Sequence, residues 1–275
     1  MSRSELQHPL ERYLRKPYVN LFCPGCGESQ TIFALLRAID ELRLDRDLVV
    51  IVCGIGCHNM IRTIVDFDVA SVLHGRSLPF ATGLKLANPE LKVIAFTGDG
   101  DGSTIGGNHL IHAARRNIDI THIFLNNFIY ANTGGQVAST TPLGAYSTTS
   151  PYGNIEPPFD MCKLVASAGA SYVARWTTAH MRPLINSIKE GINKKGFAFI
   201  EVITQCPTQY GRYNNMRTPA EMYRWLKKVS VTKSQAEKMS EEELKDKIVV
   251  GKFVDIEKPE FVEEVYKLRH RIRGE

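Results

Sequence analysis

Short apolar runs alternate with amphipathic helical patterns through most of the chain. Strands are predicted at 48–53, 69–73, 92–97, 120–126, 171–176 and 197–204. Most of these runs are continuous, which is typical of strands buried on both faces. Helices are predicted at 58–65, 79–87, 104–115, 159–168 and 179–194, after a first helix capped by Ser29. The alternation predicts an α/β protein: a parallel sheet with helices on both faces and ligands at the carboxyl ends of the strands.

Two segments depart from this alternation. The stretch 133–158 is rich in Gly, Ser, Thr and Pro without periodicity, which indicates a long functional loop. Beyond residue 212 we expect a helix from Pro219, a capping box at Ser240 and Glu243, a strand at 248–254 and a charged helix at 259–272. We therefore expect an N-terminal arm (1–16), a main domain (17–212) and a C-terminal arm (213–275) that packs on a partner. A small appendage with its own core is an equal alternative for this last part.

The composition is that of a globular protein. Of 275 residues, 43% are hydrophobic and 23% charged, which excludes a disordered, collagen-like or coiled-coil chain. No apolar run approaches the length of a membrane span, and the polar stretch 1–16 lacks the apolar region of a secretory signal. The net charge of +5 is mild for this size. We expect a cytoplasmic protein that binds neither membrane nor nucleic acid.

Cysteines provide the first candidate chemistry. The chain has six, and without an export signal they favour metal, cluster or catalytic use over disulfides. Two form a C-x-x-C pair and two more directly follow predicted strands, so that together they could hold one tetrahedral metal or one iron–sulfur cluster: Cys23, Cys26, Cys57 and Cys206. The others, Cys53 and Cys162, lie inside a strand and a helix pattern and are expected to be buried.

Polar residues with a different chemistry follow two other strands. Asp99 lies in a Thr-Gly-Asp-Gly turn, and Asn127 ends the next strand one βα unit later. Glycines let the backbone approach a diphosphate, and a carboxylate with an amide oxygen can hold a Mg²⁺ that bridges phosphate oxygens. This combination predicts a thiamine diphosphate site. A further turn, His74-Gly75-Arg76, follows another strand and suits an anionic ligand.

The full set of motifs resembles the β subunits of 2-oxoacid:ferredoxin oxidoreductases over about residues 17–212. The resemblance rests on CPGCGE (23–28), GIGC (54–57), HGR (74–76), TGDGD (97–101), IGGNH (105–109), RRN (115–117), NNFIYANTGGQ (126–136) and QCPT (205–208). The ending VVGKFVDIEKPEF (249–261) is most similar to the archaeal-type 2-oxoglutarate synthase group.

The resemblance implies specific ligands. One [4Fe–4S] cluster would be held by Cys23, Cys26, Cys57 and Cys206. Mg²⁺ would be held by Asp99, Asn127 and the carbonyl of Ile129. Thiamine diphosphate would be lined by Ile55, Gly56, Cys57, His58, His74, Gly75, Arg76, Gly100, Asp101, Ala131 and Asn132.

The resemblance also implies an activity: reversible oxidative decarboxylation of 2-oxoglutarate to succinyl-CoA and CO₂, with reduction of ferredoxin. A Glu that activates the cofactor would come from an α subunit, with γ or δ subunits as further partners, so this chain alone would be inactive. Alternatives are a pyruvate or branched-chain 2-oxoacid enzyme, a non-redox thiamine decarboxylase and a zinc-stabilised nucleotide-binding module.

One motif departs from the family pattern. Many 2-oxoglutarate members carry Lys in a TKGQ motif where this chain has Gly134. The second carboxylate of 2-oxoglutarate needs a cation, because an unpaired buried charge is costly. In this chain the candidates are Arg115, Arg116 and Arg212, and the α subunit is the favoured source.

Overall fold

The fold is built on one eight-stranded sheet, seen in a computed structural model that describes residues 8–274. The strand order is β2-β1-β3-β4-β6-β5-β8-β7, and every pairing is parallel except that of β5 with β8. The strands are β1 (Val49–Cys53), β2 (Asp68–Ser71), β3 (Lys92–Gly98), β4 (Thr121–Asn126), β5 (Tyr172–Thr177), β6 (Ala198–Ile203), β7 (Ser230–Thr232) and β8 (Ile248–Asp255).

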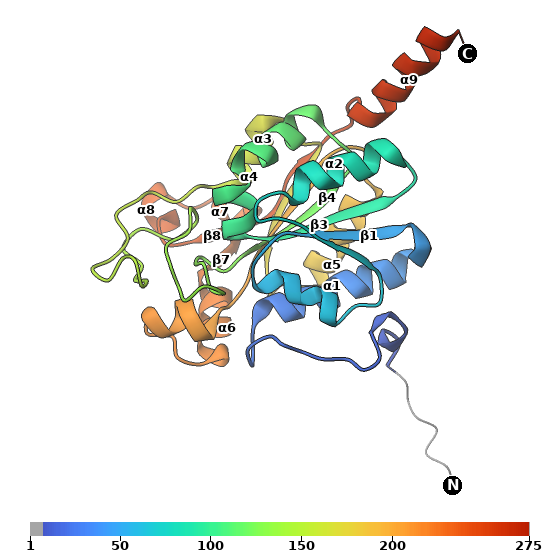
Figure 1. Ribbon diagram of the computed structural model, residues 1–275. Coiled ribbons are helices and arrows are strands. Elements are labelled where there is room, and N and C mark those ends of the chain that lie inside the picture. Colours follow the sequence, from blue (N-terminus) through green and yellow to red (C-terminus); the bar gives the residue numbers. More distant parts are fainter. Residues whose placement is uncertain (1–7, 275) are drawn as a thin grey trace.

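Helices cover both faces of the sheet (Figure 1). The α-helices are α1 (Gly27–Leu42), α2 (Ser77–Ala87), α3 (Gly107–Arg116), α4 (Met161–Ala168), α5 (Met181–Asn193), α6 (Pro219–Val229), α7 (Lys233–Ala236), α8 (Glu241–Leu244) and α9 (Phe261–Arg273). Short 3₁₀ segments are η1 (Glu11–Tyr13), η2 (Arg46–Leu48) and η3 (Cys57–Thr63), and π-helical turns are η4 (Gly100–Ile105) and η5 (Pro207–Gly211).

Two hydrophobic cores lie between these layers. Helices α1 and α5 pack on one face, where the stripe of α1 that includes Leu35, Leu36 and Ile39 is fully buried. Helices α2, α3 and α4 pack on the other face over Phe124 and Phe199. Because the central strands β3, β4 and β6 are covered on both faces, their sequences are mostly apolar, with His122 and Glu201 as buried polar exceptions.

All six strands predicted for the main domain are present, with bounds within two residues of those expected. The expectation of burial fails for β2, whose residues are exposed or half-buried because it forms the edge of the sheet. The tail strand was expected in a separate arm, but β8 joins the main sheet next to β5. The sheet is therefore mixed, with one antiparallel pairing.

Three helix predictions need correction. Ser29 is not the N-cap of α1: the helix begins at Gly27 after Cys26, and the Ser29 hydroxyl donates to the Cys26 carbonyl. The Gly27 N–H donates to the Gln205 carbonyl instead, which ties the start of α1 to the end of β6. The segment 58–65 is a short 3₁₀ connector, η3, and the segment 104–115 becomes helical only at Gly107, after η4.

The loop at 133–158 and the tail also contain local hydrogen bonds. Asn154 donates from Nδ2 to the carbonyls of Thr141 and Glu156 at 2.8 and 2.9 Å, which closes the loop on itself. The capping box of Ser240 and Glu243 is present. The division at residues 16 and 212 stays a prediction, and the expected N-terminal arm lies partly outside the described residues. Within residues 8–274, no helix combines the length and apolar character that a membrane span needs.

A network of charged side chains connects β5, β6 and the residue before α4. The Arg175 side chain is only 12% exposed, and its guanidinium donates to Glu201 at 2.6 Å and to Asp160 at 2.5 Å. Glu201 also accepts a hydrogen bond of 2.8 Å from Asn126. This network therefore fixes the last residue of β4, directly before Asn127.

Replacing Arg175 with Met should destabilise the chain by about 3–5 kcal/mol, because Glu201 would stay buried without its counter-charge. Urea unfolding followed by circular dichroism measures the change. The control is Arg182→Met on the exposed face of α5, expected to change the free energy of unfolding by less than about 0.5 kcal/mol. Equal stability of the two variants would contradict a structural role of the network.

Candidate active site

The sheet order brings the candidate residues together. Strands β2, β1, β3, β4 and β6 are neighbours in that order and run parallel, so their carboxyl ends share one edge. The turns that follow them carry, in the same order, His74, Cys57, Asp99, Asn127 and Cys206. Residues that are far apart in sequence therefore converge at one edge, as expected for a parallel sheet.

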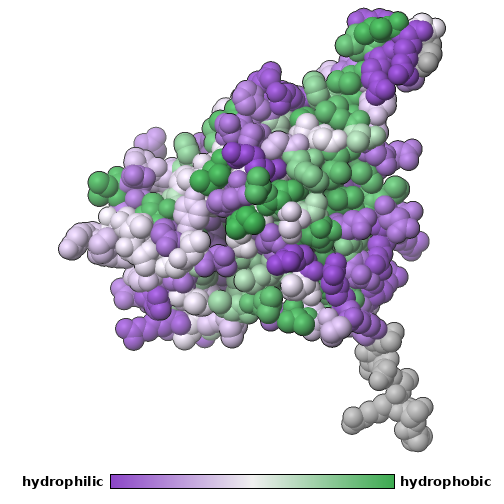
Figure 2. All heavy atoms as spheres, viewed as in Figure 1, coloured by the Kyte–Doolittle hydropathy of each residue, from purple (hydrophilic) through white to green (hydrophobic). Residues whose placement is uncertain are grey.

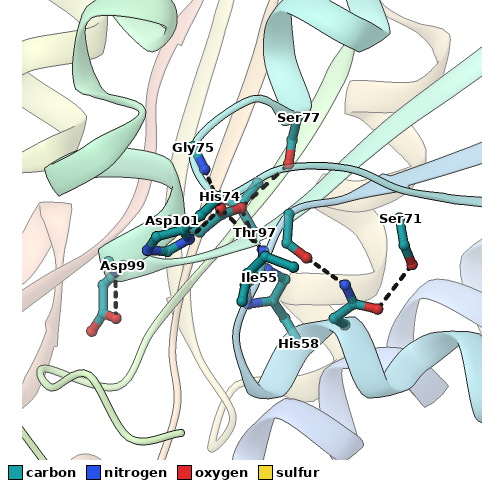
Figure 3. Close-up of polar contacts among 12 residues, drawn as sticks. Ile55, His58, Ser71, His74, Gly75, Ser77, Thr97, Asp99 and Asp101 are labelled. Atoms are coloured by element: carbon teal, nitrogen blue, oxygen red, sulfur yellow. Dashed lines mark hydrogen bonds and ion pairs between the residues drawn. The ribbon is translucent and has the colours of Figure 1, made fainter. Parts of the chain in front are cut away.

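The carboxylate of Asp101 holds three of these turns together (Figure 3). Its Oδ1 accepts from the backbone N–H of Ile55 at 3.3 Å and of Gly75 at 2.6 Å, and lies 2.9 Å from Nδ1 of His74. Its Oδ2 accepts from the Ser77 hydroxyl at 3.3 Å. Asp101 thus joins the turns after β1, β2 and β3.

Two histidines, His58 and His74, lie close to the Asp101 carboxylate and favour its ionised form. His58 Nε2 lies 3.4 Å from Asp101 Oδ2, within range of ionic attraction but without hydrogen-bond geometry. Burial alone would raise the pKa of Asp101, but the contacts with His58, Gly75 and His74 lower it to about 2. Asp101 is therefore an anion whose partners belong to the protein.

Two glycines make room for this junction. A Cβ on Gly54 would lie 2.0 Å from Asp101 Oδ1, and one on Gly75 would lie 2.5 Å from the Ile105 side chain. Gly75 also has φ +72°, a backbone conformation that other residues rarely adopt. The close approach of the turns after β1 and β2 therefore requires glycine at both positions.

A second pair of oxygens converges next to Asp101. The backbone N–H of Ile129 donates to Asp99 Oδ2 at 3.0 Å and to Asn127 Oδ1 at 3.2 Å, so both oxygens lie around one point. Burial, together with the charge of Glu28, raises the pKa of Asp99 to about 7, although backbone N–H groups oppose this. A cation between the two oxygens would compensate the buried carboxylate, and oxygen ligands of this kind suit Mg²⁺.

The two neighbouring asparagines have different partners. Asn126 is directed into the protein, where its Nδ2 donates to Glu201 and its Oδ1 accepts from the Phe128 N–H. Asn127 lies on a cavity wall. Only Asn127 is therefore placed to bind a ligand.

A cavity of about 110 Å³ lies at this junction. Its wall includes most of the predicted ligand residues: Ile55, Gly56, Cys57, His58, His74, Asp99, Gly100, Asp101, Asn127, Ile129, Ala131 and Asn132. Gly75 does not line the cavity, and its backbone N–H donates a hydrogen bond to Asp101. Arg76 is exposed at the start of α2 and does not line the cavity.

The four candidate cysteines line a second cavity of about 230 Å³: Cys23, Cys26, Cys57 and Cys206. The two cavities share one wall, formed by Cys57, Asn127, Ala131 and Asn132. By contrast, Cys53 and Cys162 are buried in the two hydrophobic cores, as expected. Four of the six cysteines therefore line one cavity, although Cys26 and Cys206 also belong to buried hydrophobic clusters.

Burial disfavours the thiolate form of two of these cysteines. It raises the pKa of Cys206 to about 11, and burial together with the charge of Glu28 raises the pKa of Cys57. Among residues 8–274, no group of three or more His, Cys, Asp or Glu side chains is arranged to hold a metal ion.

Two residues at the site lie inside the quoted motifs CPGCGE and NNFIYANTGGQ, but the sequence assigns no role to either. Glu28 is buried at the first turn of α1 and bonds to Asn127, and its position next to Gly27 reads as an ordinary helix start. The Tyr130 ring packs against Gly100 and lines the first cavity. A Cβ added to Gly100 would lie 2.1 Å from this ring. Helix-start acids and loop tyrosines are common, so neither carries a sequence signal of its own.

Known proteins are similar to this chain over nearly its whole length. Residues 54–202 match the family described as thiamine pyrophosphate enzyme, C-terminal TPP binding domain. The chain is 53% identical to the 2-oxoglutarate synthase subunit KorB of Methanocaldococcus jannaschii, over 98% of this chain and 100% of that one. It is 43% identical to the subunit of the same name from Archaeoglobus fulgidus, over 95% and 94%.

A solved structure also superposes on the chain. It is a 2-oxoglutarate:ferredoxin oxidoreductase from Magnetococcus marinus with 2-oxoglutarate, coenzyme A and succinyl-CoA bound. The TM-score is 0.87 at 28% identity, over 99% of this chain and 94% of that one.

The junction at Asp101 predicts that Gly54→Ala destabilises the chain by about 1–3 kcal/mol, because the added methyl overlaps a carboxylate that four donors hold in place. The control is Gly83→Ala in α2, where an added Cβ meets nothing within 4 Å. That change should stabilise by about 0.5–1 kcal/mol. Urea unfolding measures both, and a Gly54→Ala variant as stable as the wild type would mean that Asp101 can move.

Proposed function

Because the chain belongs to the thiamine pyrophosphate enzymes, among the KorB-type subunits of 2-oxoglutarate synthase, we propose that it binds three cofactors for that reaction. They are thiamine diphosphate, Mg²⁺ and one [4Fe–4S] cluster. The observation that carries the proposal is the wall shared by two cavities, one next to the Asp99–Asn127 oxygens and one lined by four cysteines. The reaction is oxidative decarboxylation of 2-oxoglutarate to succinyl-CoA and CO₂, with reduction of ferredoxin.

The first cavity fits the diphosphate end of the cofactor. Asp99, Asn127 and the carbonyl of Ile129 would hold Mg²⁺. A dication there would stabilise the ionised form of Asp99, which burial otherwise disfavours. Gly100 lines this cavity, and the space left by its missing side chain is filled by the Tyr130 ring. Thiamine diphosphate supplies the electron sink that lets a 2-oxo acid lose CO₂.

Protein residues position this chemistry. Asp101 fixes the turns that carry Ile55 and His74, so the cavity wall is set before a ligand arrives. His58 is buried at 2% exposure, between Asp101 and Gly98. Such preorganisation spares the site from rearranging when charge moves.

The second cavity would hold the cluster. Four thiols lie among the residues that line its volume of about 230 Å³. Iron would stabilise the thiolates, whose protonation burial otherwise favours. A cluster there would accept and donate single electrons.

A partner subunit is needed to complete the site. No Glu lines either cavity, so the Glu that activates the cofactor would come from an α subunit. Large hydrophobic side chains are exposed around the cavity mouth, namely Ile55, Leu73, Phe80 and Ile105. Figure 2 shows hydrophobic residues gathered on the surface over α2, which suits a protein neighbour. Coenzyme A and ferredoxin complete the proposed partners, with further subunits and a cytoplasmic setting as expected from the sequence.

The cation for the second carboxylate of 2-oxoglutarate would also come from the partner. Arg115 and Arg116 end α3, which starts at the site and runs to the opposite edge of the sheet. Arg212 lies on the site side, but it is exposed and bonded to the Tyr213 hydroxyl at 2.9 Å. Neither cavity is lined by Lys or Arg.

Cys206→Ala should remove the cluster, because it deletes one of four thiolates around the second cavity. The matched control is Cys162→Ala, which changes a core cysteine and should keep the cluster. Iron and acid-labile sulfide are measured after anaerobic purification with the α subunit. Equal iron in both variants and the wild type would refute the four-cysteine assignment, and zinc in place of iron would favour the zinc module.

The assembled complex should prefer 2-oxoglutarate to pyruvate and 2-oxoisovalerate by at least roughly tenfold in kcat/KM. This is about 1.4 kcal/mol of differential transition-state binding. Steady-state rates on the three acids measure it. A complex that uses pyruvate equally well would show that Gly134, in place of Lys, decides the substrate.

A further inference from the structure

Glu28 is a buried carboxylate with one partner. It lies at the first turn of α1, two residues after Cys26, and is 2% exposed. Its Oε1 accepts a hydrogen bond of 2.7 Å from Asn127 Nδ2, and its Oε2 has no partner among the described residues. Burying a carboxylate with so few contacts is costly, so its position calls for a reason beyond stability.

The contacts of Asn127 show what Glu28 does there. An asparagine amide can turn by 180°, and only its hydrogen bonds decide which end faces a ligand. Here Nδ2 faces an acceptor, Glu28, while Oδ1 accepts from the Ile129 N–H at 3.2 Å. The reverse orientation would place oxygen against carboxylate and NH₂ against N–H. Glu28 therefore keeps the carbonyl oxygen on the side of Asp99.

We propose that Glu28 is a positioning residue that fixes the Asn127 amide so that its oxygen faces the cation of the diphosphate site. This deepens the proposed function and rests on it. The same contact links the two cavities, because Asn127 lies in their shared wall and Glu28 shares the first turn of α1 with Cys26.

The anchor of Glu28 is rigid. The Gly27 N–H donates to the Gln205 carbonyl at 2.9 Å, and a Cβ on Gly27 would lie 2.6 Å from the Gln205 side chain. The first turn of α1 is thus fixed against the end of β6, next to Cys206. An acceptor held this way can orient Asn127 without a conformational change.

The test exchanges donor and acceptor between the two positions. The assembled wild-type complex is compared with Glu28→Gln, Glu28→Leu, Asn127→Asp and the double variant Glu28→Gln/Asn127→Asp. Calorimetry measures the Kd for thiamine diphosphate with Mg²⁺, and iron content and unfolding temperature are recorded for each protein. Glu41→Leu, near the other end of α1, is the matched control.

Glu28→Gln keeps an acceptor and should bind within about threefold of the wild type. Glu28→Leu removes the acceptor, and Asn127→Asp sets two carboxylates against each other, so each should weaken binding tenfold or more. The double variant should recover most of this loss, because the Gln amide donates to the new Asp. A merely structural role of Glu28 gives no such recovery.

Three results would overturn the assignment: wild-type affinity in Glu28→Leu, equal losses in Glu28→Gln and Glu28→Leu, or no recovery in the double variant. If Glu28→Leu does not assemble, the comparison of Asn127→Asp with the double variant decides alone. A wild-type complex that binds no thiamine diphosphate would instead refute the proposed function itself.

Discussion

The architecture of the site depends on one buried anion, Asp101. Parallel strands bring their carboxyl ends to one edge, and the turns beyond them must still be joined to one another. Asp101 joins the turns after β1 and β2 by hydrogen bonds from its own position after β3. Since each partner is a donor, the carboxylate is stable as an anion despite its burial, and the turns cannot separate without leaving it unpaired.

The arrangement that follows is two cavities divided by a single layer of residues. Asn127 contributes to both, and Cys57 follows the same strand as Ile55, which lines the first cavity. In the proposed reaction, electrons would cross this wall. Its thinness is a consequence of the strand order, because β1, β3, β4 and β6 are consecutive neighbours and present both sets of ligands side by side.

Much of this geometry could be predicted from sequence. Strand ends are recognisable as the last residues of apolar runs, and parallel order places them together, which is why Asp99, Asn127, Cys57 and Cys206 were identifiable. The roles of Asp101 and Glu28 were not, since each depends on partners more than 25 residues away. Local patterns also misplaced the start of α1, because its first N–H is satisfied by Gln205 rather than by a nearby side chain.

Burial makes negative charge unfavourable at several groups of the site. Asp99, Glu28 and the thiols of Cys57 and Cys206 all have pKa values raised by burial, so negative charge there is unfavourable without compensation. Neither cavity is lined by Lys or Arg. In the proposed enzyme, the compensating cations would then be Mg²⁺ and iron rather than side chains. Binding them would stabilise the folded state as well as enable the reaction, since a ligand that binds only the folded chain favours it. Since no Lys or Arg lines either cavity, the cation for the second carboxylate of the substrate would come from the partner subunit in the proposed enzyme.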